Sequence, residues 1–173
     1  MAGLKYLFYS IAGAFLALFG IFYLYANGAG RDFCPGGSLL RISSYQGSYG
    51  MTLFVLLLTV IGFGTKAGMF PMHGWLPTAH PVAPAPASAV LSGIITKSGV
   101  LAIIRVLYYT AGPELSRGTW VQDTWMTLTL ITVFMGSMMA YKEQLLKKRL
   151  AYSTVSQVSY ILFGLSVLNE SGV

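Results

Sequence analysis

Residues 62–105 read GFGTKAGMFPMHGWLPTAHPVAPAPASAVLSGIITKSGVLAIIR, and this stretch places two lysines inside apolar sequence. Lys66 follows the uncharged run 51–65, and Lys97 lies inside the apolar run 87–110. The connection between them is rich in proline and carries no Asp, Glu, Lys or Arg. An ammonium group at the centre of a bilayer costs about 3 kcal/mol on insertion scales, so a lysine at that depth is a candidate functional residue.

The composition around this stretch is that of a membrane protein. Of the 173 residues, 55% are hydrophobic and 9% are charged, whereas an ordinary soluble domain has about 25% charged residues. The net charge of +6 does not indicate nucleic-acid binding, because the basic residues are scattered or lie at the ends of apolar runs. The single cysteine, Cys34, cannot form an intramolecular disulfide, and no Cys/His spacing suits a metal. We therefore expect no metal and no other cofactor.

The apolar runs predict an all-α, polytopic transmembrane protein with a single domain of five helices, since about 20 helical residues cross the hydrocarbon. The predicted spans are residues 4–25, 49–76, 87–110, 121–141 and 150–168. The first is too long for the apolar part of a signal peptide and is expected to be a retained helix. Its residues Gly13, Ala17 and Gly20 predict a packing face. Residues 26–48 predict a polar connection on the aqueous side.

The second span is predicted to be a broken helix. Pro71 removes a backbone donor and disfavours helical geometry at the preceding residue, while Gly64 and Gly68 loosen the chain. The expected break lies near residues 66–71, with a short second half through Trp75. Discontinuous helices place binding groups near the midplane of many transporters. The alternative is a complete span that ends near residue 69, with Lys66 snorkelling to the interface and Trp75 in the aromatic belt.

Other polar features flank the two lysines. His73 and His80 titrate in a range useful for proton transfer, although such histidines are more often structural. Pro81, Pro84 and Pro86 predict a stiff connector before the third span. The residues 142–149 hold a basic cluster, and residues 150–168 carry a polar stripe at helical spacing. Counts of Lys and Arg in the short loops favour an N-terminus inside.

The stretch quoted above, together with KKRLAYSTVSQVSYILFGL downstream and AGLKYLFYS upstream, closely resembles the proton-conducting antiporter-like membrane subunits. That family includes the large membrane-arm subunits of complex I, an NADH dehydrogenase. It also includes membrane subunits of energy-converting hydrogenases and formate hydrogenlyases, and multi-subunit sodium/proton antiporters. The resemblance implies that this chain corresponds to the sixth to tenth of about fourteen helices, which form one inverted repeat with a broken second helix.

The resemblance also implies roles for particular residues. Lys66 matches the central proton carrier of the family, and Lys97 matches the lysine that passes protons toward it. Lys148 or Arg149 matches the basic pair that opens the tenth helix. The carboxylate that pairs with the first lysine, and the downstream helix that continues the path, match no part of this chain. The implied partners are therefore other membrane subunits, with the lipid bilayer and no nucleic acid.

The leading hypothesis is proton translocation by a lysine/water relay in a multi-subunit pump or antiporter of a bacterial or archaeal cell membrane. One alternative is a structural membrane fragment that does not transport alone, and another is Na⁺/H⁺ antiport. No nucleotide loop, cysteine cluster or nucleophile–base pair is visible, so the chain is not expected to be catalytic by itself. Any oxidoreductase activity would belong to partner subunits of an NADH dehydrogenase or a hydrogenase.

Overall fold

A computed structural model describes residues 2–27, 37–41 and 47–168, and every regular element in these ranges is a helix. The long single helices are α1 (Ala2–Ala26), α3 (Tyr49–Ala67), α8 (Trp120–Lys142) and α9 (Leu146–Ser166). A further long helix is continuous through α5 (Ala85–Val90), η1 (Leu91–Ile95), α6 (Thr96–Ile104) and η2 (Arg105–Ala111), of which η1 and η2 are π-helical. The short helices are α2 (Ser38–Arg41), α4 (Trp75–Val82) and α7 (Pro113–Ser116).

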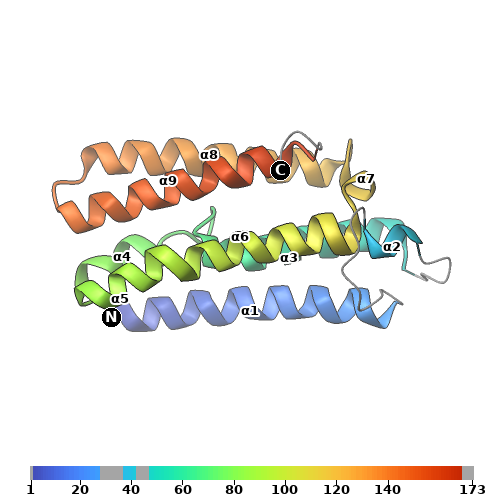
Figure 1. Ribbon diagram of the computed structural model, residues 1–173, viewed down its shortest axis with the longest axis horizontal. Helices are drawn as coiled ribbons and strands as arrows, with labels where there is room; N and C mark the ends of the chain where they lie inside the picture. Colours follow the sequence, from blue (N-terminus) through green and yellow to red (C-terminus); the bar gives the residue numbers. More distant parts are fainter. Residues whose placement is uncertain (1, 28–36, 42–46, 169–173) are drawn as a thin grey trace.

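The long helices run side by side in an elongated bundle (Figure 1). The pair α8 and α9 forms one side, α1 forms the opposite side, and α3 with the α4–η2 segment lies between them. The N-terminal end of α1 and the turn between α8 and α9 lie at the same end of the bundle (Figure 1). This arrangement places Lys5 and the basic residues of 142–149 at the same end of the bundle. The N-terminus-inside orientation stays a prediction.

Four of the described helical segments are long and apolar enough to cross a membrane: Gly3–Ala26, Tyr49–Ala67, Ala85–Ala111 and Trp120–Lys142. Helix α9 has 21 residues but begins LKKR and carries several serines, so its sequence is less apolar than these four. The fifth predicted span, residues 150–168, stays a prediction.

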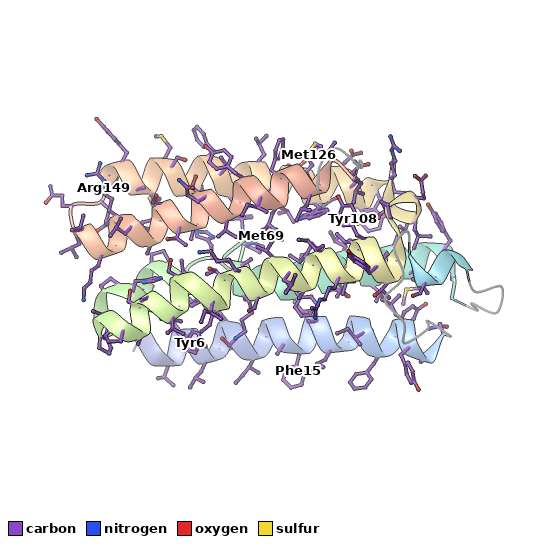
Figure 2. All side chains as sticks on the ribbon, in the orientation of Figure 1. Tyr6, Phe15, Met69, Tyr108, Met126 and Arg149 are labelled. Atoms are coloured by element: carbon purple, nitrogen blue, oxygen red, sulfur yellow. The ribbon has the colours of Figure 1, made fainter. Side chains whose placement is uncertain are left out.

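Close backbone contact joins α1 to α3. A Cβ atom on Gly62 would lie 2.6 Å from the backbone nitrogen of Ala17 and 2.7 Å from the carbonyl oxygen of Gly13. Small residues are what allow membrane helices to approach this closely. The packing face predicted from Gly13, Ala17 and Gly20 is therefore confirmed, and its partner is α3. The opposite face of α1 carries exposed side chains such as Phe15, which points away from the bundle (Figure 2).

The main core lies where α9 and α8 meet the middle layer. Leu162 and Leu165 of α9 are buried in this core. They pack with Ile103 of α6, Leu107 of η2 and Trp125 of α8. A Cβ atom on Gly136 of α8 would lie 3.2 Å from the backbone nitrogen of Ser156. Glycine at this position therefore allows α8 and α9 to pack closely. The Ser137 and Ser156 hydroxyls then hydrogen-bond across the pair at 2.9 Å. The polar stripe of α9 is therefore used in part to bind its neighbour.

One expectation from the sequence was wrong in part, and another concerns residues that the structure describes only in part. The proline-rich connector is shorter than expected, because α4 continues through Pro81 to Val82 and the next helix begins at Ala85. Pro81 lies in the last turn of a short helix, where its missing N–H removes only one hydrogen bond. Of the predicted connection 26–48, residues 28–36 and 42–46, which include Cys34, lie outside the described residues.

Candidate functional site

The break after Lys66 is a left-handed helix end. Gly68 has φ 87° and ψ 29°, a conformation that only glycine adopts without strain. The Met69 N–H donates to the Gly64 carbonyl at 2.8 Å, and the Gly68 N–H donates to the Thr65 carbonyl at 3.3 Å. These two bonds form a Schellman motif, which satisfies carbonyls that a helix end would otherwise leave free. Helix α3 thus stops one residue after Lys66, at Ala67.

Side chains from two other helices stabilise the unwound stretch between α3 and α4. The indole Nε1–H of Trp75, at the start of α4, donates to the Thr65 carbonyl at 2.7 Å. The backbone N–H of Phe70 donates to the Thr132 hydroxyl of α8 at 2.9 Å. Irregular backbone at membrane depth is tolerated where it is buried in protein and its polar groups are paired. Trp75 is 1% exposed and therefore lies inside the bundle.

We expect Trp75→Phe to destabilise the break while keeping most of the apolar packing. The substitution removes the bond to the Thr65 carbonyl, and a buried hydrogen bond contributes about 1 kcal/mol. The free energy of unfolding, measured in mixed detergent micelles, should fall by that amount. Trp120→Phe, at a half-exposed position that begins α8, is the control. Equal unfolding free energies for the two variants would contradict the assignment.

The Lys66 side chain turns from α3 toward α1. Its Nζ donates to the Ser10 hydroxyl at 3.0 Å and lies 5.4 Å from the centre of the Tyr6 ring. Figure 2 labels Tyr6 on α1, facing the middle layer. Ser10 follows the start of α1 by eight residues, or about 12 Å of helix. The ammonium group is therefore half-buried, well inside the length of a spanning helix, and has polar and aromatic partners.

Lys97 lies just after the π-helical segment η1. Its Nζ donates to the Ser92 carbonyl at 2.6 Å, and the Thr96 hydroxyl donates to the same oxygen at 2.8 Å. Lys97 is twelve residues, or about 18 Å, from the start of its helix at Ala85. Short π-helical turns inside α-helices occur frequently at functional sites. The Lys97 side chain is exposed on a face that the other described helices leave uncovered.

The structure does not bring the two ammonium groups together. Gly99 of α6 faces α3 at the level of Lys66, where a Cβ would lie 2.8 Å from the Phe63 carbonyl and 3.2 Å from the Lys66 Cβ. Lys97 precedes Gly99 by two residues, which is about 200° around the helix. The two lysines therefore lie on nearly opposite sides of α6, although their helices touch.

A cavity of about 300 Å³, mostly apolar but with several polar groups in its wall, lies between α4, α5, η1 and the first turns of α9. His80 lines it and is 5% exposed, and its Nδ1 is 2.6 Å from the Ser88 hydroxyl. The other ring nitrogen, Nε2, is buried and has no hydrogen-bond partner in the described residues. The wall is completed by residues of the continuous α5–η1 helix and of α9: Ala85, Ala89, Ser92, Lys147, Leu150, Ala151 and Thr154. The cavity combines a buried imidazole, hydroxyl groups and one lysine.

The remaining predicted residues lie apart from this group. His73 lies in the unwound stretch, where its ring stacks on Phe70 with 5.9 Å between ring centres. Lys148, in the first turn of α9, forms an ion pair of 2.8 Å with Glu143. The Glu143 carboxylate raises the pKa of Lys148 above its usual value through this hydrogen bond. Arg149 is exposed at the end of the bundle (Figure 2), and Pro71 is exposed in the turn.

Some features of the site have no signal in the sequence. The π-helical turns η1 and η2 follow from no glycine or proline pattern, and the contact of Lys66 with Ser10 and Tyr6 depends on how α1 packs. The cavity around His80 depends on the helical course of α4, which the proline-rich sequence disfavours. The hydrogen bond from Trp75 to the Thr65 carbonyl could be anticipated only in part: the sequence predicts the helix break that separates the two residues, but not that they come into contact.

The fold and the site define a multi-pass helical membrane protein with a lysine at a helix break. The whole chain, residues 1–173, matches the family described as NADH:quinone oxidoreductase/Mrp antiporter, TM. The chain belongs to that family and is an integral membrane protein.

Individual relatives agree with this assignment. The chain is 37% identical over 169 residues to Hydrogenase-4 component B of Escherichia coli (strain K12), covering 96% of this chain and 24% of that protein. It is 36% identical over 172 residues to NADH-quinone oxidoreductase subunit N of Desulforudis audaxviator (strain MP104C), covering 98% and 33%. A chain of the Mrp complex from Dietzia sp. DQ12-45-1b superimposes with a TM-score of 0.78 at 25% identity, covering 95% and 29%. The chain thus spans a quarter to a third of the length of these relatives.

Proposed function

We propose that this chain carries part of a proton path across the membrane, as a component of a multi-subunit redox-driven pump or cation/proton antiporter. Lys66 and Lys97 are the proton carriers in this proposal, linked by water, and Lys148 lies at the aqueous end. The observation that supports it most is the position of Lys66 at a helix end whose backbone groups are hydrogen-bonded by the Schellman motif and by Trp75. The names of the relatives, among them an NADH-quinone oxidoreductase subunit and an Mrp complex, favour the same class of function.

The surroundings of Lys66 suit a group that alternates between two protonation states. The Ser10 hydroxyl can accept a hydrogen bond from an ammonium group and can donate one to a neutral amine. The Tyr6 ring attracts the charged ammonium form of Lys66, but more weakly than the negative charge of a carboxylate would. Within the described residues no Asp or Glu pairs with Lys66, so its counter-charge in the proposal comes from another part of the complex.

The position of Lys97 suits a carrier that exchanges protons with neighbours beyond the described helices. Its ammonium group is held at the Ser92 carbonyl on an uncovered face. Because Lys97 and Lys66 lie on different sides of α6, transfer between them requires water or a swing of the long Lys97 side chain around the helix. The partner membrane subunits of the proposal cover this face and exclude lipid from it.

Replacing Lys97 by Met in the assembled complex tests the relay. Methionine keeps the length of the side chain and removes the proton-carrying group, and a positioned proton-transfer group accelerates transfer by about 10²- to 10⁴-fold. We expect proton uptake into vesicles, followed with a pH-sensitive dye, to fall at least tenfold. Ser98→Ala alters the neighbouring exposed residue and should leave the rate unchanged. Unchanged uptake in Lys97→Met would contradict the relay.

The same vesicles distinguish the proposal from two alternatives, a structural fragment that does not transport and Na⁺/H⁺ antiport. If the chain is a structural fragment, Lys97→Met and Ser98→Ala complexes transport protons equally well. If the transported partner ion is sodium, replacing sodium by choline in the medium abolishes proton movement. A redox-driven proton path stays active in choline and depends on Lys97.

A further inference from the structure

The turn between α8 and α9 concentrates positive charge beside exposed apolar side chains. The basic cluster, defined as Lys142, Lys147, Lys148 and Arg149, has one acidic neighbour, Glu143, which is paired with Lys148. No ion pair is recorded for the other three basic side chains among the described residues. Large apolar side chains stand exposed between and beside them: Tyr141 (85%), Leu145 (62%), Leu146 (69%) and Leu150 (58%). Positive charge mixed with exposed leucine and tyrosine is typical of a membrane–water interface.

The start of α9 adds to this charge instead of balancing it. The first turn of α9 has no acidic residue and no side-chain cap. The leading N–H groups of a helix lack partners inside the helix, and the helix dipole makes this end positive. Lys147, Lys148 and Arg149 sit in the first turn, where a cation is unfavourable. The combination leaves an excess of donors and positive charge that an anion would neutralise.

The cavity beside His80 adjoins the start of α9. Lys147, Leu150 and Thr154 of α9 line it together with Ser88 and His80. The Nε2 atom of His80 is buried and has no hydrogen-bond partner among the described residues, and only 5% of the residue's surface is exposed. A buried polar atom without a hydrogen bond is costly, so it points to a group that the described residues do not supply. At about 300 Å³, the cavity suits a small headgroup rather than a whole lipid.

We propose that this cavity and the basic cluster bind the phosphate headgroup of an anionic phospholipid. The phosphate lies at the start of α9 beside Lys147, with Arg149 adding positive charge nearby, the headgroup hydroxyls reach toward Ser88 and His80, and the acyl chains run along Leu146 and Leu150. A lipid fits better than a soluble anion, because the apolar side chains that surround the charges are exposed at the membrane boundary. This inference does not depend on the proton relay, since it involves neither Lys66 nor Lys97.

The test uses the full chain, purified in an uncharged detergent and titrated with two short-chain lipids. We expect dioctanoyl phosphatidylglycerol to bind at least tenfold more tightly than dioctanoyl phosphatidylcholine, by isothermal titration calorimetry. The double variant Lys147→Gln/Arg149→Gln removes two exposed basic groups and should weaken phosphatidylglycerol binding roughly thirtyfold. His80→Gln should weaken it less, while circular dichroism verifies that each variant keeps its helices.

The matched control is Lys5→Gln/Arg117→Gln, which removes the same net charge away from the cavity. Equal weakening in this control would mean that overall charge, and no built site, attracts the lipid. Equal binding of the two lipids by the unaltered chain would overturn the proposal outright. Inorganic phosphate that displaces phosphatidylglycerol at similar concentrations would assign the site to a free anion. An effect of Lys147→Gln/Arg149→Gln with none of the control, and no competition by phosphate, supports the lipid site.

Discussion

Lys66→Ala should abolish proton transport by the assembled complex while leaving the complex intact. The substitution removes the only amine that lies between α3 and α1 in the described part of the chain, and alanine can neither accept nor donate a proton. Loss of a positioned proton carrier lowers transfer by about 10²- to 10⁴-fold. Proton uptake by membrane vesicles that contain the variant should therefore fall to the level of vesicles without the complex.

Assembly should survive this substitution for structural reasons. The Schellman motif and the Trp75 and Phe70 hydrogen bonds that hold the break use backbone atoms of α3 and its turn, and none uses the Lys66 side chain. Blue native electrophoresis would show a complex of unaltered size. Lys5→Ala, which removes an exposed lysine near the start of α1, is the matched control and should transport normally. Loss of the assembled complex in Lys66→Ala would show that Lys66 is structural.

Gly62→Val should destabilise the protein by disrupting the close packing of α1 on α3. The new side chain would meet the backbone of α1 at Ala17 and Gly13, and backbone atoms cannot rotate out of the way. Overpacking of this kind costs about 1–3 kcal/mol. The free energy of unfolding in mixed micelles should fall by this amount. Because α1 also carries Ser10, its displacement should lower proton transport as well.

Gly50→Val provides the control on the same helix. A Cβ at Gly50 has no heavy atom within 4 Å, so the same substitution in the first turn of α3 introduces no clash. We expect an unfolding free energy close to that of the unaltered chain. If Gly50→Val and Gly62→Val destabilise the protein equally, the close packing of α1 on α3 does not contribute to stability.

Much of the architecture could be predicted from the sequence because it depends on local properties. The long apolar runs define the membrane helices, the spacing of Gly13, Ala17 and Gly20 identifies the packing face of α1, and the Gly68 and Pro71 region falls where α3 ends. Hydrophobic length and backbone freedom act within a few residues, so they leave a direct signal.

The site geometry depends on tertiary packing and could not be read in the same way. The π-helical turn η1 and the contact of Gly99 with α3 determine the side of α6 on which Lys97 lies. The partner of Lys66 is Ser10, 56 residues away in the sequence. The prolines of α4 disfavour a helix locally, yet its burial against α9 and α1 stabilises one. Tertiary contacts thus override the local preference and create the cavity around His80.

The most direct test of the proton path is the transport rate of Lys66→Arg in the assembled complex. Arginine keeps the positive charge and can still donate to Ser10, but its guanidinium does not release a proton at any accessible pH. If Lys66 carries protons, Lys66→Arg vesicles will take up protons no faster than Lys66→Ala vesicles. Uptake at the rate of the unaltered complex would mean that only a positive charge is needed at this place, and it would contradict the relay.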